Sequence, residues 1–308
     1  MVTQEATALH EVPCPLCGPG EVSPVLRDAG SHRIERSGLV ACTSLDHGAF
    51  GQIVACRGCG IRFRSPREDD ATILSHYASV EDTVYLENEP ARAVTFGRAL
   101  DRLERHVPVR GPLLDVGCYT GVFLDVAAAR GWRVTGVEPS RWGARTARGR
   151  GHEVCEGTLA SAPLPRAHFA VVTMWDALEH YTDPVAELRR ARAVTRSGGY
   201  LALTTMRIDA PVVRLLGRRW PWYMRMHLSY FTPATVERAL GLAGWRLRHR
   251  HGYAHVVTWD YLLLKLDGYA PRAGRVLRRA LARLRLSDRT VSIDLGDFMT
   301  VYAENSGA

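Results

Sequence analysis

Between residues 111 and 205, short apolar runs alternate with longer segments in which apolar residues recur every three or four positions. Short apolar runs are typical of buried strands, and the three-to-four spacing is typical of helices with one buried face. The expected strands are 112–116, 132–137, 152–155, 169–174 and 199–205, and the helices expected between them are 120–130, 140–149 and 184–195. This alternation predicts an α/β fold, a parallel, doubly wound sheet with helices on both faces.

The segments on either side of this core carry the same kinds of pattern. Upstream, one apolar face recurs at steps of three and four residues until Pro108, which predicts a helix over 93–107. Downstream, the expected elements are helices over 233–243, 256–266 and 272–286 and strands over 245–250 and 298–303. Arginines line one side of the 272–286 helix and apolar residues the other. This helix is therefore either a solvated surface element or a peripheral contact with a membrane surface.

Composition narrows the class of protein. Hydrophobic residues make up 46% of the 308 residues, enough for a sizeable core, and no apolar run approaches the ~18 residues of a membrane-spanning helix. The first residues lack the basic-then-apolar pattern of a secretion signal, so we expect a cytoplasmic protein. The net charge of +8 favours acidic or phosphate-bearing partners, without choosing among small molecules, nucleic acid and anionic membranes.

The cysteines are concentrated near the N-terminus, with five of the seven in the first 60 residues. In a reducing compartment this clustering indicates a metal site rather than disulfides. Two C-x-x-C knuckles, each followed by glycine, supply the four thiolates of a closed, structural zinc site: Cys14, Cys17, Cys56 and Cys59. The 38 residues between the knuckles contain two alternative ligands, Cys42 and His47. We therefore expect residues 1–65 to form a small zinc-ribbon-like module and 66–110 a helical connector or lid.

The stretch around residues 113–121 has the pattern of a ligand-binding loop. The first core strand is followed by Gly117 and Gly121, which bracket a tight turn before a helix. Glycine lets the backbone approach a ligand closely, and such loops bind nucleotide-like cofactors at the carboxyl ends of parallel strands. The next strand ends in Glu138, 17 residues after Gly121, close to the spacing at which an acid accepts both hydroxyls of a ribose. The G-x-G-x-x-G fingerprint of dinucleotide-binding dehydrogenases is absent, which disfavours that class.

Two further stretches in the same order make this region resemble the class I S-adenosylmethionine-dependent methyltransferases. One is the fourth core strand with the segment Asp176-Ala177-Leu178-Glu179-His180, and the other is the Gly198-Gly199 turn before the fifth strand. The resemblance covers roughly 111–205. It implies a Rossmann-like seven-stranded sheet and S-adenosylmethionine as methyl donor. It also implies a core over 111–308, with an insertion at about 256–296 before a last, antiparallel strand at the sheet edge.

The resemblance also implies which residues contact the cofactor. Glu138 is expected to accept the ribose hydroxyls. From the methionine end to the adenine, the expected contacts are Trp175, Asp176, Asp115, Gly117, Tyr119, Gly121, Glu138, Pro139, Ser140, Thr158 and Leu159. Tyr119 departs from the family pattern, because it stands where the middle glycine of the loop is common.

Methyl transfer to a hydroxyl or an acidic carbon needs a base, and histidine is suited to that role near neutral pH. Two histidines have suggestive positions. His180 follows the carboxyl end of the fourth strand, and His227 closes the aromatic segment 220–227. We expect His227 to line the acceptor pocket as the base and His180 to be the second choice. The alternative for each is a packing or capping role.

Three functions are compatible with these features. The first is methyl transfer to oxygen or carbon of a small biosynthetic molecule: a natural product, a sugar, or a glycan or lipid precursor. It is favoured because paired N-terminal knuckles before such a core resemble bacterial sugar and natural-product methyltransferases. The second is a zinc-ribbon RNA methyltransferase, disfavoured because the basic residues are spread out. The third is a cofactor-binding protein without turnover, suggested by Tyr119 alone. The sequence leaves the acceptor and the oligomeric state open.

Overall fold

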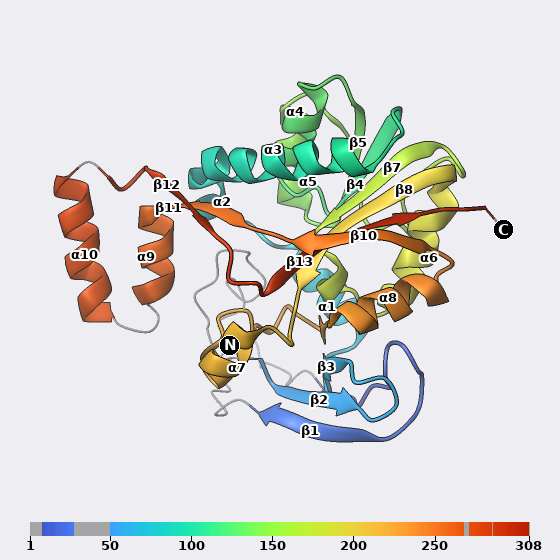
Figure 1. Ribbon diagram of the computed structural model, residues 1–308, viewed down its shortest axis with the longest axis horizontal. Helices are drawn as coiled ribbons and strands as arrows, with labels where there is room; N and C mark the ends of the chain where they lie inside the picture. The colour runs from blue at the N-terminus through green and yellow to red at the C-terminus, as the bar shows by residue number, and fades with distance from the viewer. Residues whose placement is uncertain (1–7, 28–49, 268–270, 285, 308) are drawn as a thin grey trace, which may run out of the picture.

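The computed structural model describes residues 8–27, 50–267, 271–284 and 286–307 (Figure 1). Its centre is a seven-stranded sheet in the order β10-β13-β8-β7-β4-β5-β6. The strands are β4 (Pro112–Val116), β5 (Arg133–Glu138), β6 (Glu153–Glu156), β7 (Phe169–Trp175), β8 (Thr195–Met206), β10 (Arg246–Gly252) and β13 (Phe298–Glu304). β4 to β8 run parallel, and β13 is antiparallel to both of its neighbours, β8 and β10. β7 is buried along its whole length, which explains its unbroken apolar run.

Helices cover both faces of the sheet, as predicted. On one face, α3 (Glu89–His106) and α4 (Val122–Ala128) pack onto a core that includes Leu113 and Val171. On the other, α6 (Pro184–Val194) and α8 (Pro233–Leu242) pack onto a core that includes Leu114 and Val172. Successive strand residues thus face opposite cores, as the two-residue period of a strand requires. A further helix, α5 (Arg141–Gly149), follows β5.

Local signals fix where these helices begin. Asp183 caps α6 by accepting a hydrogen bond from the backbone N–H of Ala186 at 2.9 Å, and Pro184 occupies the first turn. Thr232 and Thr235 form a reciprocal capping box at the start of α8. The remaining helices are α1 (Asp70–Ala78), α2 (Thr83–Glu87), η1 (Leu178–His180), α7 (Pro211–Leu216) and η2 (Gly217–Arg219).

The N-terminal cysteines belong to a second, antiparallel sheet, in the order β1-β2-β3-β9. β1 (Val22–Arg27), β2 (Gln52–Cys56) and β3 (Arg62–Arg64) come from the N-terminal region. β9 (Ser229–Tyr230) comes from the core, after β8, and pairs with β3. The expected zinc-ribbon-like module therefore exists as a small sheet, and one of its strands is supplied by the core. The domain boundaries at 65 and 110 stay predictions.

Four elements lie between β10 and β13. They are β11 (His255–Thr258), α9 (Trp259–Asp267), α10 (Pro271–Arg283) and β12 (Thr290–Ile293). β11 and β12 form a two-stranded ribbon, and α9 and α10 stand at the left of Figure 1, away from the main sheet. Among the helices that the structure describes, none combines the length and the apolar character needed to cross a bilayer.

Two expectations about this region were wrong. The helix predicted over 256–266 begins only at Trp259, because the β-branched residues before it pair with β12. Thr95 of α3 also holds β11, since its hydroxyl accepts the backbone N–H of Val256 at 2.8 Å. The last strand was expected at the sheet edge, but β13 lies one strand inside it and β10 forms the edge.

Candidate active site

The glycine loop after β4 has the conformation that its sequence predicts. Gly117 and Gly121 have φ values of 78° and 85°, in the left-handed region that glycine tolerates. Tyr119 also lies there, at 46°, where the family commonly has glycine. Its ring packs edge-on against Tyr85, with centroids 4.5 Å apart, and near Trp142 at 5.5 Å. These contacts hold the tyrosine in a conformation that costs a non-glycine residue roughly 1–2 kcal/mol.

Glu138 closes the loop from the end of β5. Its side chain is buried, and its two oxygens accept backbone N–H groups of Tyr119 and Ser140, both at 2.8 Å. Burial raises the pKa of Glu138 to about 7, against the opposing effect of these two hydrogen bonds. Each carboxylate oxygen has a further lone pair for a hydroxyl group. The geometry is therefore that of a fixed acid that accepts a ribose diol.

A cavity of about 510 Å³ opens at the carboxyl ends of β4, β5 and β7. All the expected cofactor residues line it except Gly121. A Cβ at Gly121 would lie 3.0 Å from the Cβ of Ala147, so this glycine serves close packing against α5. The expected cofactor site is thus one continuous surface, with Gly121 behind it.

Two polar atoms at the expected methionine end of this surface have no hydrogen-bond partner among the described residues. Asp176 Oδ1 and Trp175 Nε1 are buried without a hydrogen bond. Burial raises the pKa of Asp176 to about 7, and the charge of Arg92 opposes this shift. Buried polar atoms are nearly always paired in proteins, so an unpaired acceptor and donor side by side indicate a ligand. The ammonium and carboxylate of an amino acid suit this pair.

The two predicted histidines lie together on the cavity wall, with ring centroids 4.9 Å apart. His227 Nδ1 donates to the carbonyl of Trp222 at 2.7 Å, which leaves Nε2 as its basic atom. His180 Nδ1 lies 3.0 Å from the carbonyl of Met226 and 2.7 Å from the hydroxyl of Tyr77. Burial lowers the pKa of His227 to about 3 and that of His180 to about 4, so both rings are neutral at pH 7.

Together with Glu179, the two histidines have the donor set of a metal site. One ligand atom each from Glu179, His180 and His227 lies within 4.8 Å of the others. Glu179 is buried and accepts the hydroxyl hydrogen of Thr205 at 2.8 Å. Two imidazoles and a carboxylate suit divalent transition metals. A metal there would occupy the lone pairs that a proton needs, so the role of ligand and the role of base exclude each other.

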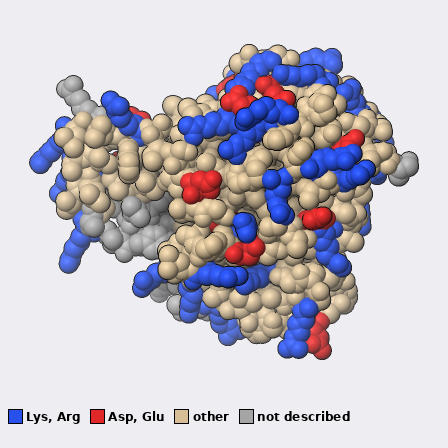
Figure 2. All heavy atoms as spheres, in the orientation of Figure 1, with Lys and Arg blue, Asp and Glu red and all other residues tan. Residues whose placement is uncertain are grey.

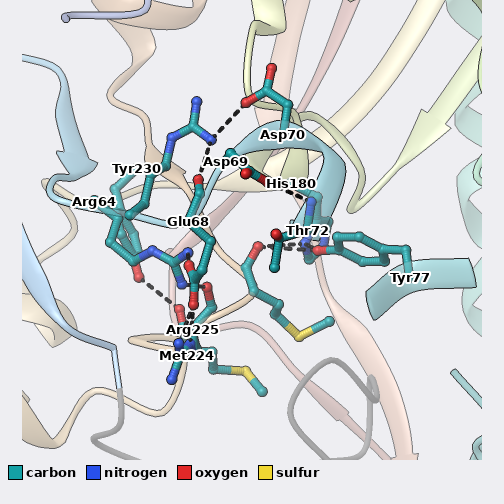
Figure 3. A network of polar contacts seen from close by, with 12 residues as sticks. Arg64, Glu68, Asp69, Asp70, Thr72, Tyr77, His180, Met224, Arg225 and Tyr230 are labelled. Atoms are coloured by element: carbon teal, nitrogen blue, oxygen red, sulfur yellow. Dashed lines mark hydrogen bonds and ion pairs between the residues drawn. The ribbon is translucent and has the colours of Figure 1, made fainter. Parts of the chain in front are cut away.

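The segment that carries His227 is bound to the cysteine module by a buried ion-pair network (Figure 3). Glu68 lies between the guanidinium groups of Arg64, on β3, and Arg225. Arg225 Nε donates to Glu68 Oε1 at 2.9 Å, and Arg64 also donates to the carbonyl of Arg225. Arg64 and Glu68 are only 4% and 2% exposed, so these charges depend on one another. No local pattern predicts this network, because Arg225 lies far along the chain from Arg64 and Glu68.

A second part of the cavity wall, which adjoins the segment with His227 at Trp222, was not predicted from the sequence either. It is built from the end of β10, the insertion and the start of β13. The residues of this insertion wall are Tyr253, His255, Val256, Val257, Tyr261, Leu262, Ile293, Leu295, Asp297 and Phe298. The apolar run after His255 was visible in the sequence as an element, but its position over the cavity was not. The insertion therefore contributes directly to the space beside the cofactor surface.

The four N-terminal cysteines form a compact cluster. Their four sulfur atoms all lie within 4.8 Å of one another, and those of Cys14 and Cys59 are 3.7 Å apart. A tetrahedral zinc ion with bonds of about 2.3 Å would place its sulfurs roughly 3.8 Å apart. Gly18 and Gly60 follow the knuckles with φ values of 76° and 77°. The donor set and its spacing fit zinc. The alternative ligands Cys42 and His47 lie outside the described residues.

The strand order, the glycine loop after β4 and the acid after β5 define a class I S-adenosylmethionine-dependent methyltransferase. Residues 86–250, more than half of the chain, match the family described as "Methyltransferase domain". The chain belongs to this family.

Several known proteins are similar to parts of the chain. An uncharacterised protein of Mycobacterium tuberculosis is 30% identical over 47% of this chain and 50% of its own length. A ubiquinone biosynthesis O-methyltransferase of Chromobacterium violaceum is 31% identical over 36% of this chain and 51% of its own. The chain thus spans about half the length of these curated relatives. A methyltransferase structure from Archaeoglobus fulgidus, 16% identical with a TM-score of 0.50, covers 72% of this chain and 100% of its own, and shows the fold.

Proposed function

We propose that this protein transfers a methyl group from S-adenosylmethionine to an oxygen atom of a small biosynthetic molecule. The observation that carries the proposal is the shared cavity. The cofactor surface and the two histidines line the same 510 Å³ space, which is in the size range of small-molecule sites. An oxygen acceptor is favoured because several of the matched relatives are named O-methyltransferases.

The chain's own residues supply binding and orientation. Glu138 would accept the ribose hydroxyls, and Asp176 Oδ1 the ammonium of the methionine end. Asp115 lines the same cavity, and its Oδ1 accepts a hydrogen bond from the hydroxyl of Thr173 at 2.6 Å. Bound S-adenosylmethionine supplies a methyl group that its sulfonium already activates. Holding it in line with the acceptor, away from water, is the main task left to the protein.

His227 is the proposed base, with His180 as the second choice. Its Nδ1–H is fixed by the Trp222 carbonyl, so Nε2 is available to take a proton from the acceptor hydroxyl. Met224 and Met226 line the cavity beside it and exclude water.

The four cysteines are proposed to bind one structural zinc ion, which would hold β3 and, through Arg64, the segment with His227. Elemental analysis should find about one zinc per chain in protein purified without chelator.

Calorimetry with S-adenosylhomocysteine tests the cofactor site. Wild-type protein should bind it one to one. Glu138→Ala should weaken binding by ~2–4 kcal/mol, since two hydrogen bonds to a charged acceptor are lost. Glu153→Ala, on the exposed start of β6, is the matched control and should bind normally. Unchanged affinity in Glu138→Ala would contradict the assignment.

Turnover needs a separate assay. Labelled S-adenosylmethionine, incubated with phenols and hydroxy acids, should give labelled product that His227→Ala fails to form. Cofactor binding without product from any acceptor would favour the alternative of a binding protein without turnover.

An RNA methyltransferase is the less favoured alternative. Figure 2 shows basic side chains scattered over the visible face and interspersed with acidic ones, rather than gathered in one stripe.

A further inference from the structure

Glu179, His180 and His227 lie on two segments that a main-chain hydrogen bond joins. Glu179 and His180 belong to η1, and the backbone N–H of Leu228 donates to the carbonyl oxygen of Glu179 at 2.8 Å. The two imidazole centroids are 4.9 Å apart, and one ligand atom from each of the three residues lies within 4.8 Å of the others. Donor atoms bonded to one zinc-class ion at about 2.0–2.2 Å are roughly 3–4 Å apart. The three side chains are therefore held close to the spacing of a metal-bound set.

Each of the two imidazoles has its Nδ1 atom occupied by the protein. His227 Nδ1 lies 2.7 Å from the carbonyl oxygen of Trp222, and His180 Nδ1 lies 3.0 Å from that of Met226. A carbonyl oxygen only accepts, so Nδ1 carries the hydrogen in both rings and Nε2 carries the lone pair. Metal-binding histidines nearly always donate their other ring N–H in this way, which fixes the tautomer and the ring orientation. Both rings thus have the outer contacts of metal ligands.

The carboxyl group of Glu179 has a neutral hydrogen-bond donor but no basic partner. Glu179 is 1% exposed, and its Oε2 accepts the hydroxyl hydrogen of Thr205 at 2.8 Å. Among the residues that the structure describes, no lysine or arginine forms an ion pair with it. Buried carboxylates are normally paired with a cation or bound to a metal. A divalent ion between Glu179 and the two histidines would supply that positive charge.

We propose that Glu179, His180 and His227 bind one divalent transition-metal ion, and that this ion inhibits methyl transfer. Two imidazoles and one carboxylate favour zinc, cobalt or nickel over magnesium and calcium, which prefer oxygen ligands. The ion takes the Nε2 lone pair of His227, which is the atom that the proposed function assigns to proton removal. The site follows from the contacts above, whereas its inhibitory effect rests on the proposed function. The site is distinct from the cysteine cluster, because it contains no sulfur ligand.

Cobalt binding to the full chain tests the site. The cysteine cluster is first loaded with one zinc ion per chain, excess metal is removed by gel filtration, and Co²⁺ is then titrated. Cobalt bound to nitrogen and oxygen gives only weak visible bands, whereas cobalt bound to thiolates adds intense near-ultraviolet absorption. We expect one Co²⁺ per chain, with the weak visible bands alone. A protein that binds no second ion, or binds it only with thiolate absorption, would overturn the proposal.

Variants identify the ligands. Glu179→Gln and His227→Gln should each weaken Co²⁺ binding by at least ~100-fold, because a lost ligand costs more than the ~10–100-fold of a lost outer contact. Thr205→Val removes only the hydroxyl that holds Glu179, and it should cost that smaller amount. His255→Phe removes another imidazole of the same cavity and should bind Co²⁺ as wild type does. Circular dichroism checks folding, and Thr205→Val tests the site even if a ligand variant fails to fold. Unchanged affinity in the folded variants, or an equal loss in His255→Phe, would overturn the site.

Turnover separates the inhibitory role from the site. Labelled product should fall with added Co²⁺ at the same midpoint as the absorption rises, and Thr205→Val should need ~10–100-fold more metal. A rise in product would overturn the inhibitory role and give the ion a part in the reaction. If the zinc-loaded protein binds Co²⁺ as described but forms no product from any acceptor, the proposed function and the inhibitory role fail together. The site itself then stands on the binding data.

Discussion

The two walls of the cavity are built in different ways. The wall formed by residues 222–228 is tied to the cysteine module by the ion pairs of the buried Glu68 with Arg64 and Arg225, and by hydrogen bonds around His180 (Figure 3). The insertion wall is held by aromatic packing around His255 and by the pairing of β11 with β12 and α3. Ion pairs and hydrogen bonds fix the side chains of the first wall. Aromatic packing fixes those of the insertion wall, where His255 Nε2 has no hydrogen-bond partner among the described residues. We infer that the first serves the reaction and the second selects the acceptor.

The largest expected effect separates these roles. His227→Ala should lower the rate of methyl transfer by ~10²–10⁴-fold with acceptor binding largely kept, since that is the usual loss for a general base. His255→Phe, in the insertion wall, should instead raise KM for the acceptor. Single-turnover kinetics on both variants checks the contrast. A slow His180→Ala beside a normal His227→Ala would reverse the two histidines. Normal rates in both would mean that positioning alone suffices.

The next effect concerns the ion pairs behind the first wall. Glu68→Gln should destabilise the protein by about 3–5 kcal/mol, because it leaves two arginines without their buried counter-charge. Urea denaturation measures this. The control is Glu21→Gln, whose partner Arg57 is exposed, with an expected change of about 1 kcal/mol or less. Glu68→Gln should also slow turnover, since Arg225 neighbours the segment with His227. A stable variant with normal kinetics would show that the two walls do not differ as inferred.

The buried carboxyl group of Glu138 should make stability and cofactor affinity change in opposite directions with pH. Glu138 has a native pKa raised to about 7, so the folded protein binds its proton more tightly than the unfolded chain does. Stability should therefore fall as the pH rises from about 4.5 through 7, by on the order of 1–3 kcal/mol. Affinity for S-adenosylhomocysteine should rise over the same range, because the carboxylate accepts the ribose hydroxyls. Thermal melts with and without the ligand measure both trends.

Glu138→Gln is the control for this prediction. The amide does not titrate, so it should flatten the part of each pH profile that Glu138 contributes. A profile that keeps its full slope in the variant would assign the titration to Asp115 or Asp176, whose pKa values burial also raises to about 7.

The smallest effect lies on the outer side of the insertion. α10 carries exposed Arg275, Arg279 and Arg283 beside exposed Val276 and Leu277. If this surface meets anionic membranes, Arg279→Gln should weaken binding to phosphatidylserine vesicles by ~1 kcal/mol, more at low salt. Arg246→Gln, an exposed arginine on β10, is the control. Equal vesicle binding by both variants would leave α10 as a solvated helix.

The sequence brought together most residues of the expected cofactor surface, which line one cavity, because their signals are local. Gly117, Glu138 and the cysteine knuckles each owe their role to a few neighbouring residues. Both walls depend instead on segments that meet only in the folded chain. The ion pairs through which Glu68 joins Arg64 and Arg225 leave no periodicity or motif in either segment. His255 stood before an apolar run that was predicted as helix, so the structure alone places it over the cavity.

Strand β9 has a consequence for how the chain is assembled. During synthesis the four cysteines are made early, but the sheet beside them lacks its last strand until Ser229 and Tyr230 emerge. The sheet of the cysteine module is therefore complete only together with the core. Shortening the chain to begin after β3 would leave β9 with an open edge, and expressing the module alone would leave the same edge open on β3.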